Sequence, residues 1–345
     1  MSANAESQKM AIASLWLALP AVLAILLGIF FLFAMVLWNP EKIRTRYEET
    51  AVSALAEKDY PTALVAAQRL LGFGSEKRNE AIFLIAKSKL GLGRTGDAAG
   101  LLEMIAPYDK PVYAPAHLLV ARNLIDRPDP DVRTDQATIA QLKNVLALEP
   151  DSVEAKALLA NLSLKKKNWL EARKYLEEIV SSKPEAMFQL IDIARALGDE
   201  RDATAWKTKA LTHYRAKFED PKSSSAADRV FYCEALLQSG EFDSALRVLA
   251  SAPESENDAA AERRIQVVYR AWSDALTPVE PDVFLQRVKD LALEVASGPN
   301  RHLANVLIAS AANDYPGDPS VQAIQRQIQD AGSDRSGVTP EKVKH

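Results

Sequence analysis

The residues that could do chemistry begin with a glycine pattern near residue 90. Residues 91–96 read GLGRTG, which matches the dinucleotide-binding pattern G-x-G-x-x-G. That pattern holds a pyrophosphate only where it joins a strand to the first turn of a helix. The preceding residues 81–90, AIFLIAKSKL, have helical periodicity instead. We therefore interpret Gly91, Gly93 and Gly96 as turn residues and expect no nucleotide cofactor.

Nucleophiles and metal ligands are scattered along the chain. Cys233 is the only cysteine, and we place it on an interior helix face without an adjacent base, where a thiol acts as a small hydrophobe. No paired carboxylates, Ser-His-Asp set or phosphate loop is found. The histidines, none of which has a second ligand at metal-binding spacing, are His117, His213, His302 and His345. The sequence therefore predicts that the protein is not an enzyme and binds no metal or cofactor.

The charge balance gives no reason to expect a nucleic-acid partner. The chain has 42 Lys and Arg against 46 Asp and Glu, a formal net charge of −4 and a pI of about 5.8. Nucleic-acid binding needs a concentrated basic face. Hydrophobic residues make up 48% of the 345 residues, which is enough to bury a core. The composition therefore indicates a folded protein that does not bind nucleic acid.

A long apolar segment lies near the N-terminus. Residues 11–38, AIASLWLALPAVLAILLGIFFLFAMVLW, contain no charged side chain. Their number exceeds the roughly 20 residues that a helix needs to cross a bilayer. Trp16 and Trp38 lie about 33 Å apart along a helix, so each can lie at one membrane interface. The sequence predicts a transmembrane helix at 11–38, with the lipid bilayer as a partner and the inner (cell) membrane as the location.

Two alternatives stay open for this segment. A cleaved signal peptide has an apolar region of about 7–15 residues, with basic residues before it and a small-x-small site after it, which fits residues 11–38 less well. The positive-inside rule favours a cytoplasmic C-terminal domain, because Lys42, Arg44 and Arg46 follow the segment and only Lys9 and the terminal amine precede it. Bacterial single-anchor repeat proteins also have the opposite topology, so the side of the domain stays open.

The chain beyond residue 40 has a repeating helical pattern. Pro150 and Pro184 lie 34 positions apart, and two amphipathic segments separated by a polar turn lie between them. Each segment places its apolar residues on one face: Val153, Ala157, Leu159, Ala160 and Leu164 in the first, and Leu170, Ala172, Tyr175, Leu176 and Ile179 in the second. No stretch shows the alternation of a strand. The pattern predicts pairs of short antiparallel helices.

This window resembles the tetratricopeptide repeat family. Ala160 and Ala172 match the small residues where the two helices of a repeat cross, and Pro184 matches the terminal proline. The resemblance implies an all-α fold, an α-α superhelical TPR-like solenoid, here following the single transmembrane helix. In layout the chain is similar to membrane-anchored bacterial members.

Similar units are found along most of the chain. The clearest second helix outside the window has Gly240, Phe242, Ala245 and Leu249, with Cys233 at the small position of its first helix. Other expected helices include Ala114 to Ile125, Arg133 to Leu148, Asp258 to Leu276 and Asp282 to Ala296. The predicted organisation is a tail at 1–10, the transmembrane helix at 11–38, repeats at 40–220 and 226–331 separated by a joint at 222–225, and a disordered tail at 332–345.

The resemblance also implies where a partner binds. In the family, peptide-contacting side chains lie on the first helix of each repeat, which lines the concave side of the array. By register these positions are Phe83, Lys87, Leu118, Arg122, Asn161, Lys165, Arg195 and Glu234. They predict a mildly basic groove for an acidic extended or helical segment. The Lys and two Asn residues of the family's carboxylate clamp are not all present, so chaperone tails are not expected.

Two functions follow from this reading. The first is a membrane-tethered scaffold or adaptor that mediates protein–protein interactions at the membrane surface. The alternative is a structural subunit of a larger membrane protein complex. Both use surfaces rather than catalytic residues.

Overall fold

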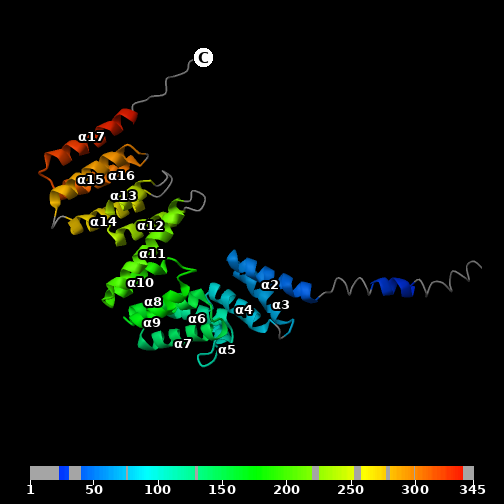
Figure 1. Cartoon of the computed structure of the whole chain (residues 1–345). Helices are drawn as coiled ribbons and strands as arrows, with labels where there is room; N and C mark the ends of the chain where they lie inside the picture. The colour runs from blue at the N-terminus through cyan, green and yellow to red at the C-terminus, as the bar shows by residue number, and fades with distance from the viewer. Residues whose placement is uncertain are drawn as a thin grey trace, which may run out of the picture. The chain divides into compact units, whose positions relative to one another are not determined.

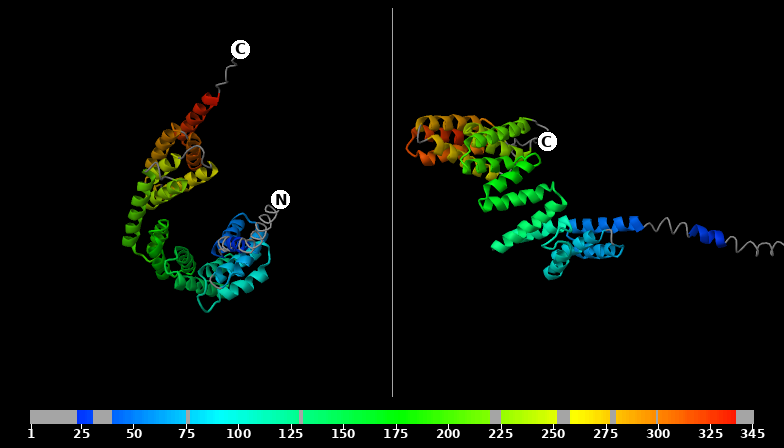
Figure 2. Two further views of the ribbon diagram at one scale, coloured as in Figure 1. Left: turned by 90° about the vertical axis from the view of Figure 1, so that its right-hand side faces the viewer. Right: turned by 60° about the horizontal axis from the view of Figure 1, so that its bottom comes forward.

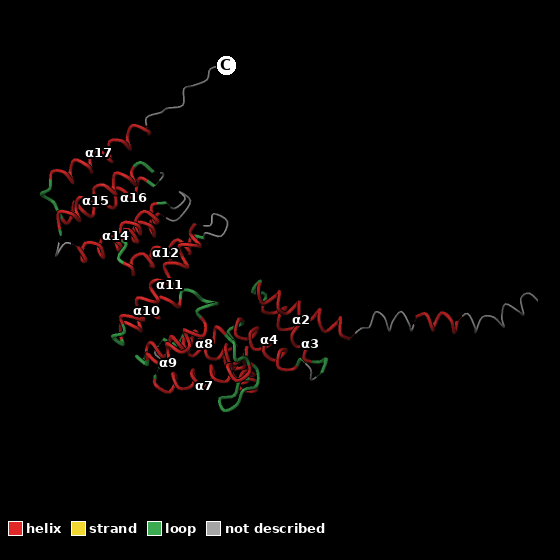
Figure 3. Tube along the Cα trace, in the orientation of Figure 1, coloured by secondary structure: helices red, strands yellow, loops and turns green. Residues whose placement is uncertain are grey.

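The fold was analysed in a computed structural model. It describes residues 23–30, 40–74, 77–128, 131–219, 225–251, 258–276, 280–298 and 300–336. Helices joined by short turns make up this described part, in which there is no strand (Figure 3). The predicted all-α helical solenoid is confirmed. The predicted joint at 222–225 lies outside the described residues except for Ser225.

The chain divides into two compact units, Met1–Ala155 and Lys156–His345. In the first unit, each helix packs mainly against a neighbour along the chain, and the packing of α5 against α6 is the weakest of these contacts (Figure 1). Its helices are α2 (Pro40–Ala56), α3 (Tyr60–Leu71), α4 (Arg78–Gly91), α5 (Thr95–Ile105), α6 (Ala114–Ile125) and α7 (Val132–Leu148). Helix α8 (Val153–Lys165) begins in the first unit and continues in the second.

The second unit repeats the arrangement. Its helices are α9 (Trp169–Ile179), α10 (Ala186–Ala196), α11 (Glu200–Glu219), α12 (Ala226–Ser239), α13 (Phe242–Ala250), α14 (Asp258–Leu276), α15 (Pro281–Ala296), α16 (Arg301–Asp314) and α17 (Pro319–Ser336). Helices α14, α15 and α17 pack against α16, and these four helices are yellow to red in Figure 2. Helix α17 extends to Ser336, which is five residues into the predicted disordered tail, and 337–345 lie outside the described residues.

One turn geometry recurs between the two helices of a pair. The residue after the first helix has a left-handed backbone at Lys58, Gly93, Lys167, Gly198 and Gly240, with φ between 57° and 78°. The next backbone N–H then donates back to the carbonyl five positions earlier, which closes a Schellman motif. These bonds are Asp59 to Ala54, Arg94 to Lys89, Asn168 to Ser163 and Asp199 to Ala194 at 2.8 Å, and Glu241 to Leu236 at 2.9 Å. The repeated turn is direct evidence of a repeated unit.

The glycine pattern at 91–96 belongs to one of these turns. Gly93 is its left-handed residue, with φ +75°. Gly91 ends α4, and a Cβ there would lie 2.2 Å from the ring of Tyr60, so only glycine allows α3 to pack this closely. Gly96 lies in the first turn of α5. These glycines therefore form a turn and allow close helix packing. A helix precedes them, whereas the dinucleotide-binding pattern requires a strand.

Small residues lie where the two helices of a pair cross. Ala51, Ala63, Ala86, Ala98 and Ala160 are fully buried. Any larger side chain would separate the helices, since interaxial distances depend on the residues at the contact. The alanine positions identified from the repeat pattern are thus core positions, and Cys233, only 4% exposed, occupies the same kind of place in α12.

The predicted transmembrane helix at 11–38, and with it the single-pass inner-membrane location, is wrong. No helix among the described residues combines the length and apolar character that crossing a bilayer requires. Within that segment the structure describes residues 23–30, which are helical. The remaining residues, with Trp16, Trp38 and the tail at 1–10, lie outside the described residues. A run of apolar residues therefore was not sufficient to predict a spanning helix.

Candidate functional site

Two of the predicted groove residues in the first unit contact each other on α4. The ammonium nitrogen of Lys87 lies 5.7 Å from the centre of the Phe83 ring. Phe83 also packs edge-on against Tyr113, with ring centres 5.6 Å apart. The Phe83 ring is half-buried, and its contact with Tyr113 packs the segment before α6 against α4. Lys87 remains exposed and is the member of this pair that can meet a partner.

The predicted residues on α6 are Leu118 and Arg122. Leu118 is half-buried, whereas Arg122 is exposed and forms an ion pair with Glu154 in the first turn of α8. Its Nε donates to the Glu154 carboxylate at 2.6 Å. The arginine is therefore already matched by a carboxylate, which makes this part of the surface less basic than its sequence indicated.

The predicted residues of the second unit lie on α8, α10 and α12. Asn161 accepts a hydrogen bond from Gln189 at 3.3 Å, and Lys165 is exposed in the last turn of α8. Arg195 lies 3.8 Å from a carboxylate oxygen of Asp192, and Glu234 accepts from Gln238 at 3.0 Å. These residues lie on the first helices of successive pairs, as the register predicted, but they do not line one common cavity.

A hollow of about 230 Å³ lies between α12 and α14, and Glu234 is the predicted residue that lines it. Apolar side chains form most of its surface, and two arginines of α14 lie at its edge. The lining residues are Val230, Cys233, Glu234, Leu237, Arg263, Arg264, Val267 and Val268. Val267 is 64% exposed, so its side chain is accessible beside the hollow.

The sequence analysis missed the α14 side of this hollow. Ile265, Val268 and Trp272 are buried and follow the helical period of the core face. Val267 departs from that period, and the adjacent Arg263-Arg264 pair precedes it. An apolar residue outside the core stripe, next to two like charges, is the signal that could have identified this surface.

Cys233 forms part of the hollow's floor. Burial raises the pKa of its thiol to about 12. The thiol is therefore protonated at neutral pH, and a protonated thiol is a poor nucleophile. This geometry suits the packing role that we expected from the sequence.

His117 has a structural environment. It is fully buried, its Nε2 accepts a hydrogen bond from the Val112 N–H at 3.1 Å, and its Nδ1 lies 2.5 Å from Gln141 Oε1. Since Nε2 accepts, Nδ1 carries the proton and donates to Gln141. Gln141 in turn donates to the Ala106 carbonyl at 3.2 Å. This chain of bonds ties the linker between α5 and α6 to helix α7, and burial lowers the pKa of His117.

The other histidines do not gather with it. His213 packs edge-on against Tyr214, with ring centres 4.9 Å apart, and His302 lies on α16. His345 lies outside the described residues. Among the residues that the structure describes, no three His, Cys, Asp or Glu side chains are grouped so that they could hold a metal ion.

The sequence matches one known family. A tetratricopeptide repeat model matches residues 133–191, which include the 150–184 window and run from α7 into α10. A search of curated proteins finds no match. The tetratricopeptide resemblance is thus supported for this central part, and the recurring turns and alanines extend the same helical-pair design beyond it.

Solved helical structures give weak overall superpositions. A structure of Naa15/Naa10 bound to HypK-THB is 16% identical, with a TM-score of 0.39 over 83% of this chain and 44% of that one. The human IFIT1 dimer with m7Gppp-AAAA is 14% identical, with a TM-score of 0.36 over 84% of this chain and 65% of that one. The P58(IPK) TPR domain is 16% identical, with a TM-score of 0.21 over 86% and 99%. The chain spans less than two thirds of the first two, and no argument rests on these likenesses.

Proposed function

We propose that this protein is a non-catalytic scaffold that binds another protein through the first helices of its helical pairs. Tetratricopeptide-like repeats support this, because stacked helical pairs form extended surfaces that proteins use for binding. The proposal needs no reactive group, which agrees with the protonated, buried thiol of Cys233 and the hydrogen-bonded, buried imidazole of His117.

The hollow between α12 and α14 is the observation that carries the proposal. Its floor of Val230, Leu237 and Val268 can receive one apolar side chain of a partner. Arg263 and Arg264 outnumber the one carboxylate of the lining, Glu234, and favour an acidic group next to that side chain. We therefore propose a partner segment in which an apolar residue adjoins an acidic one. Such a segment can bind as a helix or an extended peptide.

Photocrosslinking from Val267 tests this surface. A benzoylphenylalanine placed at 267 on α14 should capture a partner that the same probe at the exposed Val283 on α15 does not capture. Adding Arg264→Glu should reduce capture from position 267 by roughly tenfold, because a contact with a charged group is worth about 1.5–3 kcal/mol. Equal capture from both positions, or capture that ignores Arg264→Glu, contradicts the site.

The wider groove is tested separately. Reversing Arg122 and Arg195 together to glutamate should weaken capture of the same partner, because both are exposed on first helices. Helical circular dichroism should be unchanged. If capture stays at the original level, the partner does not use Arg122 of the first unit or Arg195 of the second.

A further inference from the structure

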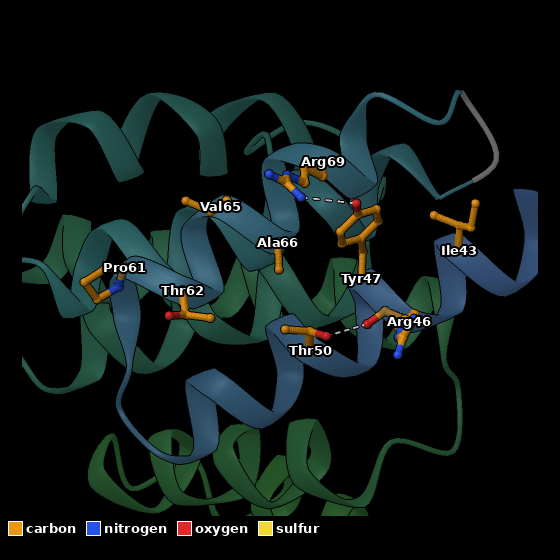
Figure 4. A pocket seen from close by; sticks show the side chains of 9 residues that line it. All are labelled: Ile43, Arg46, Tyr47, Thr50, Pro61, Thr62, Val65, Ala66 and Arg69. Atoms are coloured by element: carbon orange, nitrogen blue, oxygen red, sulfur yellow. Dashed lines mark hydrogen bonds between the residues drawn. The ribbon is translucent and has the colours of Figure 1, made fainter.

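The outer side of the first helical pair is an open groove. Helices α2 and α3 pack against each other and, on one side, against α4. The two helices also line a cavity of about 780 Å³, which Figure 4 shows from close by. In a helical array this is the position where the helices of another pair would pack. The groove therefore has the form of a helix-packing surface.

Side chains from both helices line this groove. Helix α2 contributes Ile43, Arg46, Tyr47 and Thr50, and helix α3 contributes Pro61, Thr62, Val65, Ala66 and Arg69. Pro61, Val65 and Arg69 recur every four residues and form one stripe along α3. Val65 is 51% exposed, so its apolar surface is available for packing.

The groove is basic at this end. Its lining includes Arg46 and Arg69 and no carboxylate. The Arg69 guanidinium donates to the Tyr47 hydroxyl at 3.3 Å and lies 5.6 Å from the centre of the Tyr47 ring, as drawn in Figure 4. Arg46 is exposed beside it. Two positive charges thus accompany the apolar stripe, and one of them is held in place by an aromatic ring.

The other end of the same face is acidic. A second hollow of about 390 Å³ shares Thr50 and Thr62 with the first and extends towards the α2–α3 turn. Its lining includes the carboxylates of Glu49, Glu57 and Asp59. The Thr62 backbone N–H and side chain hydrogen-bond to Asp59 and lower its pKa, which keeps this carboxylate ionised. Glu49 precedes Thr50 on α2, whereas Glu57 and Asp59 lie beyond Thr50 and Thr62. Thr50 and Thr62 therefore mark the middle of a face that has Arg46 and Arg69 at one end and Glu57 and Asp59 at the other.

Such a face is complementary to itself. If a second copy is rotated by half a turn about an axis through the middle of the face, its acidic end lies on the basic end of the first. A two-fold interface uses the same patch on both subunits, so each charge contact is made twice. The charged residues along α2, from Arg46 to Glu57, extend over about 16 Å, so about three helical turns are paired.

We propose that the groove of α2 and α3 is a homodimer interface, in which two copies pack these helices antiparallel around Thr50 and Thr62. Val65 and Ile43 of each copy fill the groove of the other. Arg46 and Arg69 of one copy face Glu57 and Asp59 of the second. This interface is separate from the α12–α14 hollow and does not depend on it.

Analytical ultracentrifugation of the full chain tests the apolar part. The wild-type protein should dimerise within about 1 µM to 1 mM, the range of weak to moderate association. Val65→Asp should weaken dimerisation at least tenfold. The matched control is Val52→Asp, because Val52 is equally exposed, at 52%, on the same helical pair but lines neither hollow. A protein that stays monomeric, or a dimer that survives Val65→Asp, overturns the proposal.

Charge reversal tests the pairing. A variant with Arg46→Glu and Arg69→Glu has a wholly acidic face. A variant with Glu49→Lys and Glu57→Lys has a mainly basic face, in which Asp59 is the one carboxylate left among the lining residues. Each should be monomeric alone, and an equimolar mixture should form a one-to-one heterodimer. Failure of the mixture to associate contradicts the antiparallel arrangement, whatever each variant does alone.

A crosslink at the two-fold axis gives a readout that does not rely on affinity. The thiol of Cys233 is buried, so a bismaleimide should react mainly with an introduced cysteine. T50C should yield a covalent dimer, whereas V52C, placed on another side of α2, should not. Equal crosslinking of both variants would show random collision or another occupant of the groove, and would refute the interface.

Discussion

The helical pair α6–α7 and the cluster formed by α14, α15 and α16 close their cores in different ways. In the first, a buried His117–Gln141 hydrogen bond connects the two helices. In the second, Trp272 packs edge-on against Phe284 with ring centres 5.4 Å apart, and Tyr269 lies 5.6 Å from the same ring. One region thus depends on hydrogen-bond geometry and the other on buried aromatic volume.

The linkers explain the difference. The α5–α6 linker is long enough to leave backbone groups without helical partners, and buried backbone groups must be paired. Gln141, Asn144 and His117 supply those partners: Gln141 donates to the Ala106 carbonyl, Asn144 to the carbonyls of Pro107 and Tyr108, and His117 accepts from Val112. Gln141, Asn144 and His117 therefore satisfy backbone groups of a segment that leaves regular structure.

The largest effect is expected in the aromatic cluster. Phe284→Ala removes a side chain with no exposed surface and should lower the free energy of unfolding of the second unit by about 3–5 kcal/mol. Urea titration followed by tryptophan fluorescence would measure this, because Trp272 touches the ring. Val283→Ala, on the same helix and 45% exposed, is the control and should change stability by less than about 1 kcal/mol. Similar losses from both variants would mean that the cluster is not a core.

The second largest loss of stability is expected at the hydrogen-bonded pair His117 and Gln141. Gln141→Leu keeps side-chain volume but leaves the His117 N–H and the Ala106 carbonyl without partners, at about 1–3 kcal/mol each. We expect a loss of about 2–5 kcal/mol in the first unit, measured by urea unfolding followed by circular dichroism. Gln136→Leu on the exposed side of α7 should be nearly neutral. A neutral Gln141→Leu would show that the network contributes specificity rather than stability.

The fold was more predictable from the sequence than the site. Helical period and turn residues are local, so Ala114 to Ile125 and Asp258 to Leu276 were predicted with the bounds of α6 and α14. Partners distant in sequence were not predictable: Glu154, which pairs with Arg122, and Arg264, which borders the hollow containing Glu234, lie about 30 residues away. Register places a residue on a face, but neighbouring helices decide its charge environment.

The N-terminal prediction failed for a different reason. It used hydropathy over 11–38, which reports the cost of exposing side chains to water but does not by itself place a helix across a bilayer. Of this segment the structure describes residues 23–30, which are helical, and Ile25 and Phe30 are 62% and 66% exposed. A composition argument therefore could not replace the backbone geometry.

The stability of the α6–α7 pair should depend on pH. Burial lowers the pKa of His117 from its usual 6.5, so the unfolded chain binds this proton more readily than the folded one. The stability that His117 contributes is complete above pH 6.5 and is lost as the pH falls below it. Protonation would also place a second N–H against the Val112 N–H, which now donates to Nε2.

His117→Asn tests this response, because asparagine keeps a donor for Gln141 but does not titrate. The first unit of the variant should lose less stability between pH 7 and pH 5 than that of the wild type, in urea titrations at each pH. His213 provides the comparison in the second unit, because burial and then Lys217 lower its pKa as well. An NMR titration in which His117 protonates at or above pH 6.5 would refute the assignment.

The smallest effect is expected on the exposed side of α6. Arg122 and Glu154 form an ion pair with side chains 51% and 40% exposed, and such pairs contribute about 0–1 kcal/mol. Arg122→Ala should therefore leave the free energy of unfolding within about 1 kcal/mol of the wild type, with any loss vanishing at high salt because exposed charges are screened. Glu154→Gln should behave alike. A larger loss would mean that Arg122 belongs to the structural network that includes His117, and that reduced partner capture by its variants reports unfolding rather than a binding surface.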